Sequence, residues 1–246
     1  MSADSERTPD HPQSKLPGFT VSDIILIQIP MAVSAAALLF ASARLLERPL
    51  DAAWYVAAFL GTWCVYLHDS AQLYGRVSIG EESSVWPNVV VRAECHEVSI
   101  GRYSNLQDFA MLHIGYGHST EIGDFCSITH HATVHGAKIE DDCLIGINAV
   151  VMDGAMIGKG SIVAGGAMIR EDSEFAPGSI IAGVPAKQIA ERDCSHANRQ
   201  NAWQYHWNAQ AYKAGNHRSW DGPEYETWMR NKIAEIARDE DLTGIR

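Results

Sequence analysis

The chain has 246 residues, enough for one large domain with appendages, and a formal net charge of −11 with a pI near 5.4. This acidic balance argues against a nucleic-acid partner, because phosphate recognition needs a basic face and the sequence has no Lys/Arg stripe. The five cysteines include no Cys-x-x-Cys pair and are odd in number, which favours a reducing compartment over a disulfide framework. We therefore expect a protein that is not secreted.

The N-terminal part is predicted to comprise two segments. Residues 1–20 are polar and proline-containing, and we expect a disordered tail. Residues 21–67 form an apolar helical segment with two uncharged runs, 24–43 and 52–67; the first has the length that spans a hydrocarbon core. A membrane hairpin, helices packed on a partner or on the domain's open end, and an ordinary buried helix stay open as interpretations. The first would associate the protein with a membrane, at its cytoplasmic face.

An aliphatic residue recurs at every sixth position of residues 68–187, apart from three breaks. Helices repeat near 3.6 residues and strands near 2, so a period of six indicates a chain that turns a corner every six residues. Three such sides make one triangular coil of about eighteen residues, which predicts a mainly β protein, a parallel β-helix of about five coils. The aliphatic positions are Ile79, Val85, Val91, Ile100, Leu106, Leu112, Ile122, Ile128, Val134, Ile139, Ile145, Val151, Ile157, Val163 and Ile169. Small residues follow four positions later, among them Cys95, Cys126 and Cys143.

The remaining residues, 188–246, are charged and rich in Trp and Tyr, and they are predicted to form C-terminal α-helices. Trp203 and Trp207 are four apart, so they share one helical face. The sequence Asp-Gly-Pro-Glu at 221–224 indicates a helix start with proline in the first turn. We expect these helices to lie along the prism or along its neighbour.

Two histidines are predicted to stack on one face of the β-helix. Arg92, His113 and His135 each follow the third aliphatic residue of a coil, so all three fall on the same face of consecutive coils. Because the aliphatic residues point inward and strand side chains alternate, these three point outward. Rungs lie about 4.8 Å apart. Two imidazoles at that spacing can share a zinc ion, whose bonds to histidine nitrogen are about 2.0–2.1 Å.

A third histidine, His130, is predicted to lie at a corner, at the far end of the face that carries His135. Five extended residues separate the two, on the order of 16 Å. One chain cannot easily close a three-histidine site with that geometry, but a neighbouring subunit related by threefold symmetry can. If all three histidines are ligands, the sequence predicts a cyclic trimer with metal ions at its interfaces. His131, one residue away, is the rival ligand.

Four motifs resemble those of the gamma-class carbonic anhydrases, left-handed β-helix trimers of the hexapeptide-repeat superfamily. The motifs are Arg-Ala-Glu at 92–94, Asn-Leu-Gln-Asp at 105–108, Met-Leu-His at 111–113 and His-His-Ala-Thr-Val-His-Gly at 130–136. The likeness covers about residues 66–190. It implies left-handed coiling and three zinc ligands, His113, His130 and His135.

The resemblance also implies roles for four further residues. Gln107 matches the glutamine that orients the metal-bound water, and Asp108 matches the aspartate that supports the subunit interface. Arg92 and Glu94 match a pair that forms an interfacial salt bridge near the metal, with glutamate in place of the family's aspartate.

The activity that the resemblance implies is zinc-dependent, reversible hydration of carbon dioxide to bicarbonate by a metal-bound hydroxide, the lyase reaction of a carbonic anhydrase. Iron or cobalt could replace zinc. The acidic loop that carries a proton-shuttling glutamate in the best-studied branch is missing, which leaves His96 and Glu97 as relay candidates. Three alternatives stay open: a non-catalytic assembly subunit of a membrane complex, a hexapeptide acyltransferase, and an acyl-CoA thioesterase. The trimer could hold identical or sister chains.

Overall fold

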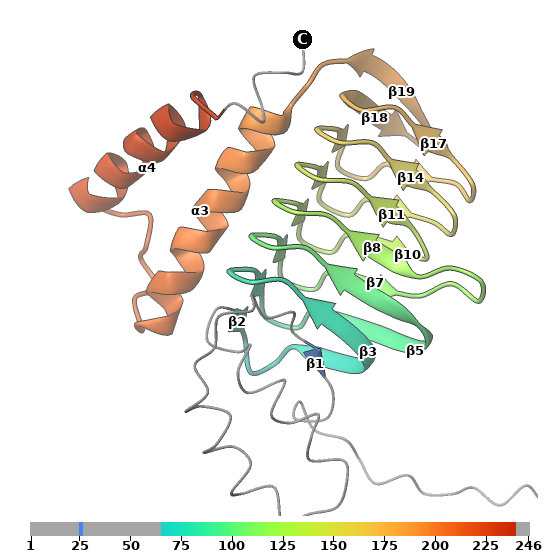
Figure 1. Ribbon diagram of the computed structural model, residues 1–246, viewed down its shortest axis with the longest axis horizontal. Coiled ribbons are helices and arrows are strands. Elements are labelled where there is room, and N and C mark those ends of the chain that lie inside the picture. The colour runs from blue at the N-terminus through green and yellow to red at the C-terminus, as the bar shows by residue number, and fades with distance from the viewer. Residues whose placement is uncertain (1–24, 27–64, 240–246) are drawn as a thin grey trace, which may run out of the picture.

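The computed structural model describes residues 25–26 and 65–239 as a parallel β-helix with two α-helices along one side (Figure 1). The predicted class, a mainly β, left-handed parallel β-helix with C-terminal helices, is confirmed. The predicted tail, residues 1–20, and nearly all of the apolar segment 21–67 lie outside the described residues. No helix within the described ranges is long and apolar enough to cross a membrane.

The strands stack into three faces, and every turn of the chain adds one strand to each. Strands β3 (Gln72–Ile79) and β5 (Val90–Ile100) pair in parallel and pass from the first face to the second. The first face continues with β7 (Met111–His113), β10 (Thr133–His135), β13 (Val150–Val151) and β16 (Met168–Ile169). The second continues with β8 (Thr120–Ile122), β11 (Lys138–Ile139), β14 (Met156–Ile157) and β17 (Glu174–Phe175).

The third face forms a separate sheet, and both ends of the stack are covered by short strands. Its parallel strands are β2 (Tyr66–Leu67), β4 (Ser84–Val85), β6 (Asn105–Leu106), β9 (Ser127–Ile128), β12 (Leu144–Ile145), β15 (Ile162–Val163) and β18 (Ser179–Gly183). Strand β19 (Ala186–Glu191) pairs antiparallel with β18 and ends the stack. At the opposite end β1 (Ile25–Leu26) pairs in parallel with β3.

The six-residue repeat forms the core. Every aliphatic position named above is buried, and so are the small residues that follow, with one correction. Cys95 was assigned to a small-residue position but is exposed. The pairing of β3 with β5 jumps from Gly75↔Ala93 to Arg76↔Glu97, so residues 94–96 bulge outward and Ala93 takes the inward position. The bulge places Glu94 on the surface beside the first face.

The corner between the third and first faces is turned by stacked residues in the left-handed region of backbone space. Phe109, His131 and Asn148 have φ values of 61°, 59° and 59°. Each turn is held to the one before it, for example by the His131 N–H, which donates to the Asp108 carbonyl at 3.1 Å. This ladder stacks the two residues that precede the turns, Asp108 and His130, on one another.

One helix covers the third face, and a second helix packs on that helix. Helix α3 (Ser195–Lys213) packs against β2, β4, β6 and β9, and α4 (Pro223–Ile236) packs on α3 (Figure 1). The predicted proline start is confirmed, because Pro223 is the first residue of α4. Trp203 and Trp207, which were predicted to share one helical face, both lie in α3. The C-terminal helices therefore form one wall beside the coils.

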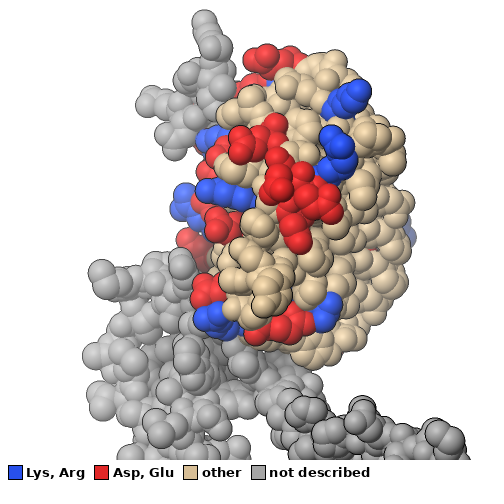
Figure 2. All heavy atoms as spheres, turned by 90° about the vertical axis from the view of Figure 1, so that its right-hand side faces the viewer, with Lys and Arg blue, Asp and Glu red and all other residues tan. Residues whose placement is uncertain are grey.

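The acidic balance of the sequence is visible on the surface. Figure 2 shows acidic side chains gathered on the face turned to the viewer, with isolated Lys and Arg side chains around them. That face presents no continuous basic surface of the kind that phosphate backbones require.

Candidate metal centre

The predicted stacking of the two first-face histidines is confirmed. His113 of β7 pairs in register with His135 of β10 on one side and with Arg92 of β5 on the other. The two imidazole centroids lie 4.8 Å apart, and His113 Nδ1 lies 2.9 Å from His135 Nε2. Both side chains are partly exposed, 19% and 30%. The face therefore presents two imidazole nitrogens side by side.

Each of these rings is held by a carboxylate on the side away from the other ring. Glu94 Oε2 lies 3.0 Å from His113 Nε2. Asp153 Oδ1 forms a short hydrogen bond with His135 Nδ1. A carboxylate accepts the imidazole N–H and fixes which nitrogen carries the proton. The two unprotonated nitrogens, Nδ1 of His113 and Nε2 of His135, then face one another.

Glu94 also links His113 to Arg92. Arg92 Nη1 lies 2.5 Å from Glu94 Oε1 within the same chain. Partial burial acts to raise the pKa of Glu94, but a backbone hydrogen bond, the His113 hydrogen bond and the Arg92 charge together lower that pKa below its ordinary value. Glu94 is therefore a carboxylate at neutral pH. The resemblance implied an interfacial salt bridge for Arg92 and Glu94, and here the pair forms in one chain.

The third predicted ligand, His130, lies at the corner and is oriented from two sides. Asp108 Oδ2 lies 3.1 Å from its Nδ1, and Tyr205 Oη of α3 lies 3.4 Å from its Nε2. Burial, reinforced by the charge of Asp108 and by Tyr212, raises the pKa of Tyr205 to about 12. Tyr205 is therefore a neutral phenol at physiological pH. The Asp108 carboxylate thus contacts a ring nitrogen of His130, as the Glu94 carboxylate contacts a ring nitrogen of His113.

Gln107 is buried on the His130 side of the corner. Its Nε2 donates to Asn105 Oδ1 at 2.9 Å, and Asn105 Nδ2 donates to Ser127 Oγ at 2.9 Å. Ser127 Oγ in turn donates to Asn201 Oδ1 of α3 at 2.8 Å. The side chain of Gln107 is thus fixed with its own carbonyl oxygen as the remaining acceptor.

Sequence reasoning missed Asp153, Tyr205 and Asn201. The two α3 residues lie outside the part of the chain that resembles the family, and no repeat phase marks them. Asp153 could have been found from the repeat. It lies at the corner directly after β13, and β13 stacks on β10, the strand that carries His135.

The other polar candidates have different partners. His131, the rival ligand, stacks on Phe109 with the ring centroids 4.9 Å apart. Of the relay candidates, His96 Nε2 lies 3.0 Å from the Tyr116 carbonyl, and Glu97 forms a 3.5 Å ion pair with Arg76.

The donor set fits a divalent ion. Each of the three predicted ligand histidines contacts a different carboxylate, an arrangement typical of imidazoles that bind metals. Within the single described chain, residues 65–239, no three His, Cys, Asp or Glu residues come together as a metal site. A cavity of about 600 Å³ adjoins His130 and is lined by Asp108, Trp86, Tyr205 and Trp220. His113 and His135 do not line this cavity.

The stacked six-residue turns define the chain as a hexapeptide-repeat β-helix protein, and residues 136–171 match a family model described as bacterial transferase hexapeptide (six repeats). A Methanocaldococcus jannaschii protein named "Probable carbonic anhydrase" is 50% identical over 127 residues, covering 52% of this chain and 80% of that protein. Gamma carbonic anhydrase 3, mitochondrial, of Arabidopsis thaliana is 40% identical over 179 residues, 69% of each chain. The chain belongs to the gamma carbonic anhydrase family.

A solved structure with the same fold comes from a transferase group. The crystal structure of a hexapeptide transferase family protein from Anaplasma phagocytophilum aligns with a TM-score of 0.54 and 26% identity, covering 60% of this chain and 92% of that one. The fold by itself is therefore shared between two kinds of enzyme, and the histidines must carry the distinction.

Proposed function

We propose that this protein catalyses the reversible hydration of carbon dioxide to bicarbonate, with zinc held at the interfaces of a trimer. The observation that carries the proposal is the carboxylate on each of three histidines: Glu94 on His113, Asp153 on His135 and Asp108 on His130. Membership of the gamma carbonic anhydrase family supports the reaction. The corner position of His130, away from the other two, supports the trimer.

His113 and His135 of one subunit and His130 of a neighbouring subunit would hold the ion. A divalent ion with three neutral imidazoles acidifies water to a pKa of about 7 and so supplies a nucleophile at neutral pH. Iron or cobalt can occupy the same ligands, because three imidazoles suit several divalent ions.

The protein's own groups orient the reactants. Gln107 donates one of its two amide N–H groups to Asn105, which leaves its second N–H and its carbonyl oxygen to orient the attacking water. Arg92 lies one rung from His113 on the same face, with its side chain 41% exposed. Arg92 donates from Nη1 to Glu94, and its remaining N–H donors are available to the bicarbonate product. Asp108 orients His130 from within the same subunit.

The test joins metal analysis to a rate measurement on one preparation. The purified protein should contain about one zinc, iron or cobalt ion per chain and should hydrate carbon dioxide in a stopped-flow assay. His113→Ala should lose the metal and the activity together, whereas His131→Ala should retain both, since its ring stacks on Phe109. A metal-loaded parent without hydration activity would refute the catalytic proposal and leave a non-catalytic assembly subunit as the function.

A second candidate, acyl transfer or acyl-CoA hydrolysis, is favoured by the transferase family model. That match begins at residue 136, after all three histidines, so it describes the coils and not the site. Incubation with acetyl-CoA and a thiol reagent separates the two functions. Release of free CoA that is lost in His113→Ala, in a protein that does not hydrate carbon dioxide, would replace the first proposal with the second.

We further propose that the protein associates with a membrane on its cytoplasmic side, through the part of residues 24–67 that lies between β1 and β2. Two uncharged runs in this segment support the proposal. Alkaline carbonate extraction of expressed protein tests it: the full chain should stay in the pellet and a variant lacking residues 1–64 should be released. Full release of the intact chain would refute membrane association.

A further inference from the structure

Asp153 lies outside every motif that resembles the family, yet it contacts a predicted metal ligand. It occupies the corner that follows β13, between the first and second faces. Its Oδ1 accepts a hydrogen bond from His135 Nδ1, and in the described part of the chain its carboxylate forms no ion pair with a Lys or Arg. Among the described residues, the His135 ring is therefore the one ionisable side chain that pairs with this carboxylate.

Two glycines hold this carboxylate in place. A Cβ atom at Gly115 would lie 2.8 Å from Asp153 Cγ, and one at Gly136 would lie 2.4 Å from Asp153 Oδ1. Side-chain atoms do not approach that closely without displacement. The corner therefore has room for this carboxylate only because both neighbours lack a side chain.

Glu94, the carboxylate on the other histidine, is held less tightly. It projects from the bulge at residues 94–96, its side chain is 49% exposed, and it divides its oxygens between His113 and Arg92. The Asp153 side chain is 31% exposed and lies between glycines on two successive rungs. Of the two first-face carboxylates, Asp153 is the one whose position the backbone determines.

We infer that Asp153 is a positioning residue of the metal centre, which keeps the His135 proton on Nδ1 and so presents Nε2 as the ligand nitrogen toward His113. The inference rests on the proposed metal centre. An imidazole with its proton on Nε2 has no lone pair there to give to an ion. Loss of a carboxylate behind a ligand histidine typically weakens metal binding 10–100-fold.

The test measures zinc affinity of the full-length protein by competition with a chromophoric chelator. Asp153→Asn should bind zinc about 10–100-fold more weakly than the parent. Gly115→Ala should weaken binding in the same direction, because the three atoms nearest to the new methyl group all belong to the Asp153 carboxyl group. Gly115 has no positive φ, so alanine there brings no backbone strain of its own.

Matched controls exist for both variants. Gly117→Ala changes a glycine of the same loop whose added Cβ would meet nothing within 4 Å. Asp172→Asn removes a corner carboxylate beside Gly154, and asparagine tolerates the left-handed φ of 55° at that position. Both controls should bind zinc as the parent does. Parent-like affinity in Asp153→Asn would overturn the inference.

A metal-free readout separates this inference from the proposed function. Nitrogen-15 NMR of histidine-labelled, zinc-stripped protein should show the His135 proton on Nδ1 in the parent and a shift toward Nε2 in Asp153→Asn. If the parent binds no divalent ion, the proposed metal centre fails even where the tautomer is as expected. If the parent binds zinc but its His135 carries the proton on Nε2, the inference fails and the centre stands.

Discussion

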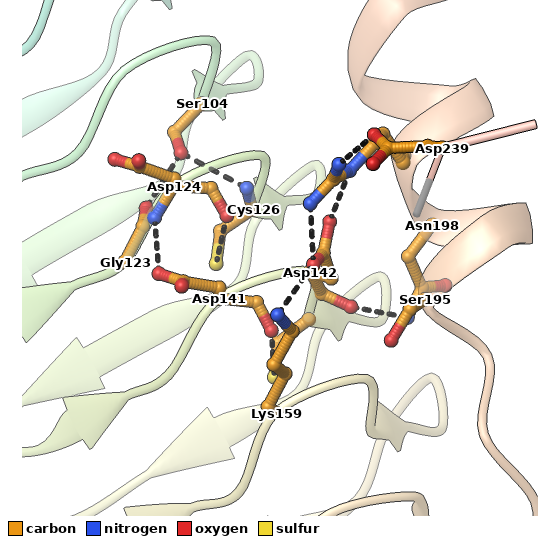
Figure 3. A network of polar contacts seen from close by, with 12 residues as sticks. Ser104, Gly123, Asp124, Cys126, Asp141, Asp142, Lys159, Ser195, Asn198 and Asp239 are labelled. Carbon is orange, nitrogen blue, oxygen red and sulfur yellow. Dashed lines mark hydrogen bonds and ion pairs between the residues drawn. The ribbon is translucent and has the colours of Figure 1, made fainter. Parts of the chain in front are cut away.

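Asp142 and Arg199 form a bidentate ion pair that joins helix α3 to the β-helix. Arg199 Nε donates to Asp142 Oδ1 and Nη2 donates to Asp142 Oδ2, each at 2.8 Å (Figure 3). Asp142 is fully buried and the Arg199 side chain is 10% exposed. Asn198 adds a hydrogen bond to the Asp142 carbonyl at 2.8 Å. Because α3 carries Tyr205 and Asn201, this pair sets the distance between those residues and the His130 corner.

Removing one partner of this pair should destabilise the protein strongly. Arg199→Met leaves the buried Asp142 carboxylate without its main counter-charge, which costs about 3–5 kcal/mol of unfolding free energy. Urea unfolding monitored by tryptophan fluorescence measures the loss. Lys159→Met, which removes a cation 3.7 Å from Asp142 that is 30% exposed, should cost less than about 1 kcal/mol. Equal losses for the two variants would contradict a dominant role for Arg199.

Acid should weaken the packing of α3 through His206. Burial lowers the pKa of His206 below its ordinary value, and Lys213 and Lys232 add to this effect, while Glu82 at 3.4 Å opposes it. A histidine whose folded pKa is lowered resists protonation in the native state. Its unfavourable contribution is absent above the unfolded pKa of about 6.5 and grows as the pH falls below that value.

The matching measurement compares unfolding free energies at pH 7.5, 6.5 and 5.5, at one protein concentration. The parent should lose stability across this range more steeply than His206→Gln, by at most about 1.4 kcal/mol per pH unit for one proton. His217→Gln serves as the control, because His217 lies on the exposed connection between α3 and α4. Parallel pH profiles for the parent and His206→Gln would show that His206 does not contribute.

The six-residue repeat predicted the β-helix and the stacking of two candidate histidines, because the repeat determines which residues of successive coils lie side by side. Register between rungs is determined by the inward aliphatic residues, so the outward neighbours His113 and His135 had to stack. The contacts that no phase determines were missed. The bulge that brings Glu94 to His113 interrupts the repeat, and Tyr205 reaches His130 from a helix more than seventy residues later in the chain. Such long-range packing has no local signal in a single sequence.

The backbone cost of the corners can be measured at Gly166. This glycine has a φ of 70° at the same corner as His131 and Asn148, and a Cβ added there would meet nothing within 4 Å. Gly166→Ala should therefore destabilise the fold by about 1–2 kcal/mol through the left-handed conformation alone. Gly166→Asn should cost less, because asparagine adopts this conformation more readily. A neutral alanine variant, measured by thermal unfolding, would show that the corner relaxes.

The residues of the proposed interface site come from two subunits. Mixing inactive variant subunits tests which residues each subunit contributes. His130 and Asp108 belong to the subunit that contributes the corner, whereas His113, His135, Glu94 and Asp153 belong to the subunit that contributes the first face. An inactive His130→Ala protein and an inactive His135→Ala protein, unfolded together and refolded, should form trimers in which some interfaces have all three histidines. Those interfaces should restore a fraction of the carbon dioxide hydration activity.

The grouping makes a sharper prediction for Asp108, whose carboxylate orients His130 within one chain. Asp108→Asn should bind zinc about 10–100-fold more weakly, and its activity at limiting zinc should fall accordingly. Mixing it with His135→Ala should restore activity, because the latter supplies an intact corner. Mixing it with His130→Ala should not, because neither partner has one. Restoration with His130→Ala but not with His135→Ala would place Asp108 with the first face, and restoration in neither mixture would show that each chain builds its own site.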